Sequence, residues 1–424
     1  MPPSRFHPPF RVLGILLSVA LLAVSAMAAP FTPQTRVGYT VGDQWEPALA
    51  TDGFGHVYVL YPQYGRVPGC PLCPEPSMTL VVSDNNGETW ESPRQITPAR
   101  SGQFDPQIAV DPVDHRTLYA AWLQNGRAEV IVAKSADFGQ SWLVISAAHM
   151  DDIDKPTLTV RGPDVYVAFN HERNLWIAAS HDGGITYASN PVTAQARGSW
   201  SLPGGGTVDL SGTVHFAWAQ YSRNRGRINL YISRSSDGGK SWSNTFMGAS
   251  GSAPDCSMFR CEDGYLGAQI NVTSDAAGTL YALWNASPRD KGAPRIYFAS
   301  STTGGVTWSQ KAEVSKAPTN VNHAFPTLVA GSPGDVRVAW MDTRNSPHWN
   351  TYYRSSTNGG ASWSHEVRIS SNVPGYIYIR PQGFGFPFGD YFELGIDSRG
   401  QTQAAWGEGL NFKSPGSIWH SVGR

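Results

Sequence analysis

An eight-residue motif that recurs six times constrains the fold of this 424-residue chain more than any other feature. It reads Ser-x-Asp-x-Gly-x-(Ser/Thr)-aromatic, with Asn or Thr in place of Asp in three copies. An Asp or Asn side chain can accept hydrogen bonds from N–H groups of its own turn, and Gly permits the positive φ of a tight hairpin. Spaced at intervals of about 45 to 66 residues, the copies predict one β-hairpin in each of six similar units. They span residues 83–90, 135–142, 180–187, 235–242, 301–308 and 356–363.

A longer repeat occurs seven times and consists of a strand, a polar turn and a second strand that ends in an aromatic residue. Apolar residues alternate within it, as in the run from Val336 to Trp340. A short third strand follows each copy, and the octet then leads into a fourth. Seven four-stranded units predict an all-β, seven-bladed β-propeller over residues 32–424. The copies lie at 47–61, 106–122, 156–169, 207–218, 268–284, 326–340 and 391–406.

The seventh unit lacks an octet and ends at Ile418 to Ser421, which matches a third strand. Its missing fourth strand is expected at Thr35 to Gly38, just before the first inner strand. One sheet built from both ends of the chain would close the ring and remove its open edges.

The N-terminal segment has the pattern of a secretory signal peptide. Arg5 and Arg11 precede an apolar run from Val12 to Val24. Ala26-Met27-Ala28 follows the run as a small-x-small cleavage pattern. We expect residues 1–28 to be removed before Ala29, and the protein to be secreted or periplasmic. An uncleaved anchor is the alternative. No later segment is apolar enough to cross a membrane.

Four cysteines in an exported chain favour disulfides, and Cys70–Cys73 and Cys256–Cys261 are the simplest pairs. A zinc site that uses all four thiolates and a redox C-x-x-C at Cys70 are the alternatives. The formal net charge of −1 gives no reason to expect binding to nucleic acid or to an anionic membrane surface.

The six octets resemble the Asp boxes, or BNR repeats, of the sialidase-like propeller superfamily, and the resemblance covers nearly the whole mature chain. It implies a protein that acts on or binds carbohydrate, with the Asp boxes on the face away from the active site. Sialidases of this superfamily use an Arg triad, a Tyr–Glu pair and an Asp, carry an Arg-Ile-Pro motif and have six blades. This chain has no Arg-Ile-Pro and seven units, so no family residue is transferred by motif.

Propeller topology places the starts of the inner strands at one mouth of the central channel, where carboxyl side chains recur beside Pro. Glycoside hydrolysis needs two carboxyl groups, one of them with a raised pKa. The predicted catalytic residues, expected within one cleft, are Glu46, Asp105, Asp390 and Tyr391. Together with Asp154, these carboxylates can instead hold a calcium ion or cap the strands. No other cofactor is expected.

Further polar and aromatic residues are predicted on the same face, at strand starts and in the loops between second and third strands. Arg suits capture of a sugar carboxylate, and exposed aromatic rings stack on sugars. The predicted substrate-binding residues are Trp45, Lys155, His171, Arg173, His323, Arg344, Trp349 and Arg380. The structural alternative is local ion pairing, for example between Asp342 and Arg344.

Three functions follow from the sequence, and each predicts a different channel-mouth face. A glycosidase or polysaccharide lyase needs converging carboxyls or a Tyr and a carboxyl, with Arg. A non-catalytic propeller that binds glycan or protein needs only a shallow surface. A structural assembly factor would show a hydrophobic patch.

Overall fold

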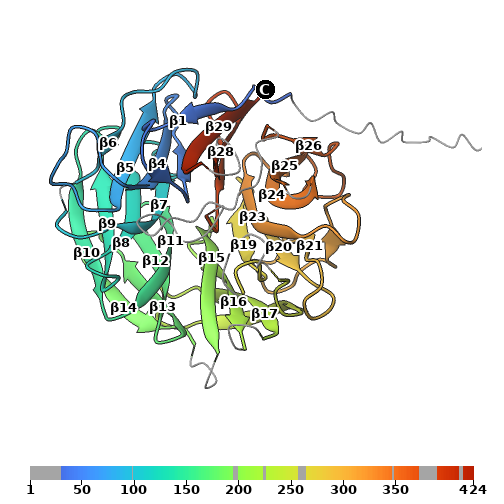
Figure 1. The fold of residues 1–424 in the computed structure, drawn as a ribbon. Helices are drawn as coiled ribbons and strands as arrows, with labels where there is room; N and C mark the ends of the chain where they lie inside the picture. Colours follow the sequence, from blue (N-terminus) through green and yellow to red (C-terminus); the bar gives the residue numbers. More distant parts are fainter. Residues whose placement is uncertain are drawn as a thin grey trace, which may run out of the picture.

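The computed structural model describes residues 30–97, 99–193, 199–222, 226–255, 264–345, 348–371, 389–409 and 414–424. Within these residues 29 strands and no helices form seven sheets around a common centre (Figure 1). The predicted all-β, seven-bladed propeller is therefore confirmed. No helix in this part of the chain is long and apolar enough to cross a bilayer.

Each blade is an antiparallel sheet whose first strand is innermost. Blade 1 contains β2 (Asp43–Gln44), β3 (Ala48–Thr51), β4 (Val57–Tyr64), β5 (Ser77–Ser83) and β6 (Arg94–Gln95). Blade 2 contains β7 (Phe104–Val110), β8 (Leu118–Gln124), β9 (Glu129–Ser135) and β10 (Leu143–His149). Blade 3 contains β11 (Ile153–Arg161), β12 (Asp164–His171), β13 (Asn174–Ser180) and β14 (Ala188–Pro191). Blade 4 contains β15 (Trp200–Val208), β16 (Val214–Tyr221), β17 (Ile228–Ser235) and β18 (Ser243–Ser250).

The remaining blades follow the same order. Blade 5 contains β19 (Ile270–Ser274), β20 (Leu280–Ala286), β21 (Arg295–Ser301) and β22 (Ala312–Glu313). Blade 6 contains β23 (His323–Ala330), β24 (Val336–Asn345), β25 (His348–Ser356) and β26 (Val367–Arg368). Blade 7 contains β27 (Glu393–Ile396), β28 (Thr402–Gly409), β29 (Gly416–Gly423) and β1 (Thr35–Val37).

Blade 7 closes the ring as predicted, with the N-terminal strand β1 beside the C-terminal strand β29 (Figure 1). The two strands pair antiparallel, with Thr35 opposite His420 and Val37 opposite Ile418. A bridge between Phe31 and Gly423 extends the contact. Val37 is buried in a core shared by blades 7 and 1, so the closure contributes apolar packing as well as backbone hydrogen bonds.

The Asp boxes form the turns between third and fourth strands, with the geometry that the octet predicts. In blade 2, Asp137 Oδ1 accepts the N–H of Ser141 at 2.9 Å, and the Ser135 hydroxyl accepts the N–H of Gly139 at 2.9 Å. Hydrogen bonds lower the pKa of Asp137 to about 2, and the bond from the Ser141 hydroxyl contributes most. Trp142 Nε1 donates to the Gly139 carbonyl and packs its ring on the blade core. The box of blade 2 thus fixes its hairpin and leaves Asp137 ionised at neutral pH.

A second Asp repeat, which the sequence shows only as a polar turn, joins the first and second strands of five blades. Asp52 Oδ1 illustrates it by accepting the N–H groups of Phe54 and His56, two and four residues later. The other members are Asp111, Asp209, Asp275 and Asp397. Two of them also bind the next blade, because Asp111 accepts the N–H of Gly162 and Asp275 that of Gly334. These turns therefore link neighbouring blades on the Asp-box face.

The cysteine and signal-peptide predictions have different outcomes. Cys70 and Cys73 form the predicted disulfide in the loop between β4 and β5, so a zinc site that uses all four thiolates is wrong. Cys256, Cys261 and the signal peptide at residues 1–28 lie outside the described residues.

Candidate functional site at the channel mouth

A β-bulge at the start of the inner strand aims one side chain of several blades toward the channel mouth. In blade 2, Asp105 and Pro106 together lie opposite Trp122, since Phe104 pairs with Leu123 and Gln107 pairs with Ala121. The same bulge occurs at Lys155-Pro156 in blade 3 and at Phe325-Pro326 in blade 6. Side chains of a strand normally point to its two faces in turn. The extra residue of a bulge interrupts this alternation, so the residue in the bulge can point toward the channel mouth.

The residue before Pro has a left-handed backbone in each of these bulges and at the equivalent position of blade 1. The φ angles are 54° for Glu46 in blade 1, 52° for Asp105, 52° for Lys155 and 54° for Phe325. A positive φ is uncommon for residues other than Gly and costs on the order of 1 kcal/mol or more, so it persists only where the surroundings fix it. Four equivalent positions share this strained conformation, and three of them carry charge at the channel mouth.

Lys155 lies at the centre of a group of three carboxyl side chains. Its Nζ is 2.6 Å from Asp390 Oδ2, 2.9 Å from Asp105 Oδ1 and 3.5 Å from Glu46 Oε1. The side chains come from blades 1, 2 and 3 and from the segment that leads into β27. Exposure of the side chains is 17% for Lys155, 15% for Asp390, 10% for Asp105 and 2% for Glu46, so the cluster opens to solvent only at one side.

The surroundings of this cluster raise the pKa of both Lys155 and Glu46. Burial would lower the pKa of Lys155, but Asp105, Asp390 and Glu46 outweigh it and raise that pKa well above its ordinary value. Burial raises the pKa of Glu46 well above its ordinary value, and Asp390 and Asp105 add to this against the opposing effect of Lys155. Lys155 is therefore a permanent cation, while Glu46 is the carboxyl that holds a proton.

Tyr391 and Asp154 border the cluster. The Tyr391 ring centre lies 5.3 Å from Lys155 Nζ, and its hydroxyl points to the Pro106 carbonyl at 3.4 Å. Burial, then the charges of Glu46 and Asp105, raise the pKa of Tyr391 well above 10, so the phenol stays protonated. Burial and the charge of Asp105 raise the pKa of Asp154 to about 6, and Arg127 lies 3.5 Å from its carboxylate.

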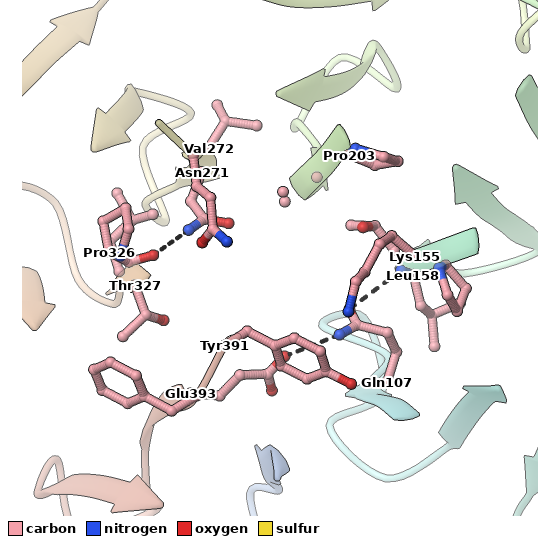
Figure 2. A pocket seen from close by; sticks show the side chains of 18 of the residues that line it. Gln107, Lys155, Leu158, Pro203, Asn271, Val272, Pro326, Thr327, Tyr391 and Glu393 are labelled. Carbon is pink, nitrogen blue, oxygen red and sulfur yellow. Dashed lines mark hydrogen bonds between the residues drawn. The ribbon is translucent and has the colours of Figure 1, made fainter. Parts of the chain in front are cut away.

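A cavity of about 200 Å³ lies beside the cluster, within the channel, and is lined by the inner strands of blades 2 to 7. Figure 2 shows Lys155, Gln107, Tyr391 and Glu393 on one side of it, with Asn271 and Pro326 across from them. This volume is below the range of most small-molecule pockets, and amide and hydroxyl groups line much of it. The cavity therefore suits a small polar ligand, about one sugar unit in size.

Glu393 lies in this cavity and was not predicted from the sequence. Its Oε2 accepts the Leu49 N–H at 2.7 Å and its Oε1 accepts from Gln107 at 3.4 Å. Burial raises the pKa of Glu393 to about 8, so the folded protein keeps this carboxyl protonated where the unfolded chain has lost the proton.

Because Glu393 keeps its proton only in the folded protein, the free energy of unfolding is expected to fall as the pH rises from about 4.5 to about 8. The raised pKa contributes stability that is complete below about pH 4.5 and lost by about pH 8. Glu393→Gln should remove about 3–4 kcal/mol of the decrease in unfolding free energy between pH 5 and 8, because one pKa unit corresponds to about 1.4 kcal/mol. Urea titrations at both pH values measure it, with Glu172→Gln on the exposed blade 3 loop as control. An unchanged pH dependence in Glu393→Gln would contradict the assignment.

The structure brings together Glu46, Asp105, Asp390, Tyr391 and Lys155, but it places most other predicted binding residues elsewhere. Trp45 and Trp349 are buried in the core between blades 6 and 7. His323 is fully buried, with Nε2 2.7 Å from the Ser315 hydroxyl and Nδ1 2.8 Å from the Pro294 carbonyl. None of these three presents a surface to a ligand in this structure, because the core that covers them is packed.

The predicted arginine and histidine of the loops have local partners or lie at loop tips. Arg344 pairs with Asp342 at 2.6 Å and with Glu366, and lies 3.6 Å above the Tyr352 ring, so the structural alternative holds for this residue. His171 Nδ1 is 2.7 Å from the Asp151 carbonyl, and Arg173 is exposed at the tip of the β12–β13 hairpin. Arg380 lies outside the described residues.

A calcium ion among the carboxylates would compete with Lys155, whose ammonium lies between Asp105 and Asp390. In the described part of the chain no three His, Cys, Asp or Glu side chains are grouped to hold a metal ion.

Comparison with known families and proteins places the chain among repeat propellers. A family described as BNR repeat-like domain matches residues 43–267, slightly more than half of the chain. No curated protein sequence matches this chain.

Solved structures of similar fold include proteins with and without a known activity. A protein of unknown function from Dyadobacter fermentans shares 14% identity with a TM-score of 0.53, over 93% of this chain and 98% of that one. An ulvan lyase, a polysaccharide lyase, shares 12% identity with a TM-score of 0.54, over 91% of this chain and 95% of that one. An α-L-arabinofuranosidase of Fusarium graminearum shares 11% identity with a TM-score of 0.50, over 93% and 98%. At these identities the likeness shows the fold alone.

Proposed function

Because the chain belongs to the BNR repeat-like family, we propose that it is an exported carbohydrate-active propeller that hydrolyses a glycosidic bond at its channel mouth. The observation that carries this proposal is the cluster of three carboxyls around Lys155, beside a polar cavity of about one sugar in size. Two similarly folded proteins are by name a polysaccharide lyase and an arabinofuranosidase, which supports carbohydrate as the substrate class. The Cys70–Cys73 disulfide supports export, since disulfides persist in oxidising compartments.

The two kinds of carboxyl in the cluster suit the two roles of glycoside hydrolysis. Glu46, with its raised pKa, can donate a proton to the leaving oxygen as general acid. Asp105, which lines the cavity with its Oδ1 2.9 Å from Lys155 Nζ, can act as base or nucleophile at the sugar carbon. Lys155 positions these carboxylates, and the protonated Tyr391 phenol can donate a hydrogen bond to the sugar.

Glu46→Gln is expected to lower kcat at least 100-fold on whichever glycoside the protein cleaves, because an amide cannot donate the required proton. A panel of chromogenic glycosides and polysaccharides identifies the substrate, and single-turnover rates give the effect. Asp137→Asn is the matched control, since it removes a carboxyl from the opposite face, where Asn85 and Asn358 already serve two other boxes.

If the Glu46→Gln protein cleaves as fast as wild type, Glu46 does not take part in the reaction.

The second candidate function is a non-catalytic glycan- or protein-binding propeller. The deep burial of Glu46 and the direct ion pairs of Lys155 favour it, because both describe a cluster that holds four segments of the ring together. A wild-type protein that binds glycans and cleaves none would establish that alternative.

A further inference from the structure

Among the described residues, the cluster at the channel mouth has more carboxyl groups than ammonium groups, and this bears on which sugars the site accepts. Three carboxyl groups surround one ammonium, and each lies within 3.5 Å of it. Even with a proton on Glu46, the two carboxyl groups of Asp105 and Asp390 outnumber the single ammonium of Lys155. A carboxylate of a ligand brought within about 4 Å of this cluster would be repelled strongly, because the site is largely shielded from water.

Two carboxyl oxygens of the cluster make no hydrogen bond within the described residues, although Lys155 Nζ lies 3.5 Å from one of them. They are Glu46 Oε1 and Asp390 Oδ1, both buried. A proton shared between the two carboxyls satisfies them in the free protein, and a sugar hydroxyl can satisfy them in a complex. A carboxylate or sulfate group has no proton to donate at neutral pH and would leave both oxygens without a partner.

The rest of the cavity lining is also suited to hydroxyl groups. Gln107, Gln269 and Asn271 contribute amides, and Thr157 and Thr327 contribute hydroxyls, all on inner strands or just before them. Amides and hydroxyls can both donate to and accept from a sugar hydroxyl. The lining thus adds neutral hydrogen-bonding partners to a cluster that is itself negative.

We propose that the channel-mouth site selects sugars without an acidic group, so that its substrate is a neutral glycan rather than a sialylated, uronic or sulfated one. This inference rests on the proposed function and names the substrate class of the same site. Selection arises from like-charge repulsion at Asp105 and Asp390, which both line the cavity.

Calorimetric binding to matched glycan pairs tests the proposal on the full-length mature protein. The pairs are lactose with 3′-sialyllactose, and xylotetraose with its glucuronic acid-substituted form. The neutral member of at least one pair should bind at least ten-fold more tightly than the acidic member. Asp390→Asn and Asp105→Asn should each narrow that ratio at least three-fold, because each removes one negative charge. Asp137→Asn on the Asp-box face should leave the ratio unchanged.

The outcomes separate this inference from the function on which it rests. Tighter binding of the acidic members, or a ratio that neither site variant changes, would overturn the selection of neutral sugars and leave a carbohydrate-binding propeller in place. Failure of every neutral and acidic glycan to bind would overturn the proposed function, and the inference with it.

Discussion

Replacing Lys155 with methionine should destabilise the protein by about 3–5 kcal/mol at pH 7, because three buried carboxyls lose their common cation. Urea unfolding measures the effect. The loss should shrink at pH 5, since carboxyls that lack the cation bind protons more tightly in the folded state than in the unfolded chain. Stability of the variant therefore rises as the pH falls.

Lys311→Met is the matched control for this experiment. Lys311 is exposed and lies 4.7 Å from the centre of the Tyr297 ring, a contact worth about 0.5–1 kcal/mol at such a site. Lys155→Arg keeps the charge and shows whether charge or shape decides the result. If Lys155→Met unfolds at the wild-type urea concentration at pH 7, the cluster does not hold the blades together.

Removal of the closing strand should cost about 5 kcal/mol. A chain that begins at Tyr39 lacks Val37, whose full burial contributes about 1.5–3 kcal/mol, the partly buried Phe31 and the backbone bonds to β29. Urea unfolding of the shortened chain gives the loss. A synthetic peptide of residues 30–38, added in excess, should restore most of it, because the vacated edge of β29 stays the same.

A peptide with Asp in place of Val37 is the control, since a charged side chain cannot enter the core shared by blades 7 and 1. Equal stability of the shortened and mature chains would show that β1 is dispensable for ring closure.

The blades, the Asp boxes and the closing strand could be predicted from the sequence because each depends on local patterns. The octet encodes its own turn, as Asp137 and Gly139 show, and repetition then determines the architecture. Glu46, Asp105 and Asp390 could be predicted to gather because each precedes or begins an inner strand. That inference needs only the topology.

The direction of individual side chains could not be predicted in the same way. Trp45 and Glu46 are neighbours, yet the ring of one packs into the core and the carboxyl of the other contacts Lys155. The left-handed backbone at Glu46 decides this, and it leaves no signal in the alternation of apolar residues. The sequence also could not show that Lys155 lies between three carboxyl groups. That position depends on distances between blades, which no local pattern encodes.

The pairing of β1 with β29 also affects the order in which the molecule can assemble. Among the strands of the ring, residues 35–37 leave the ribosome first and residues 416–423 last, so the earliest strand has no partner until the last strand has been made. Blades 1 to 6 can form progressively, each on the one before it. The ring itself, and a channel mouth that needs blades 1 and 7 side by side, becomes available only when the final eight-residue strand has emerged.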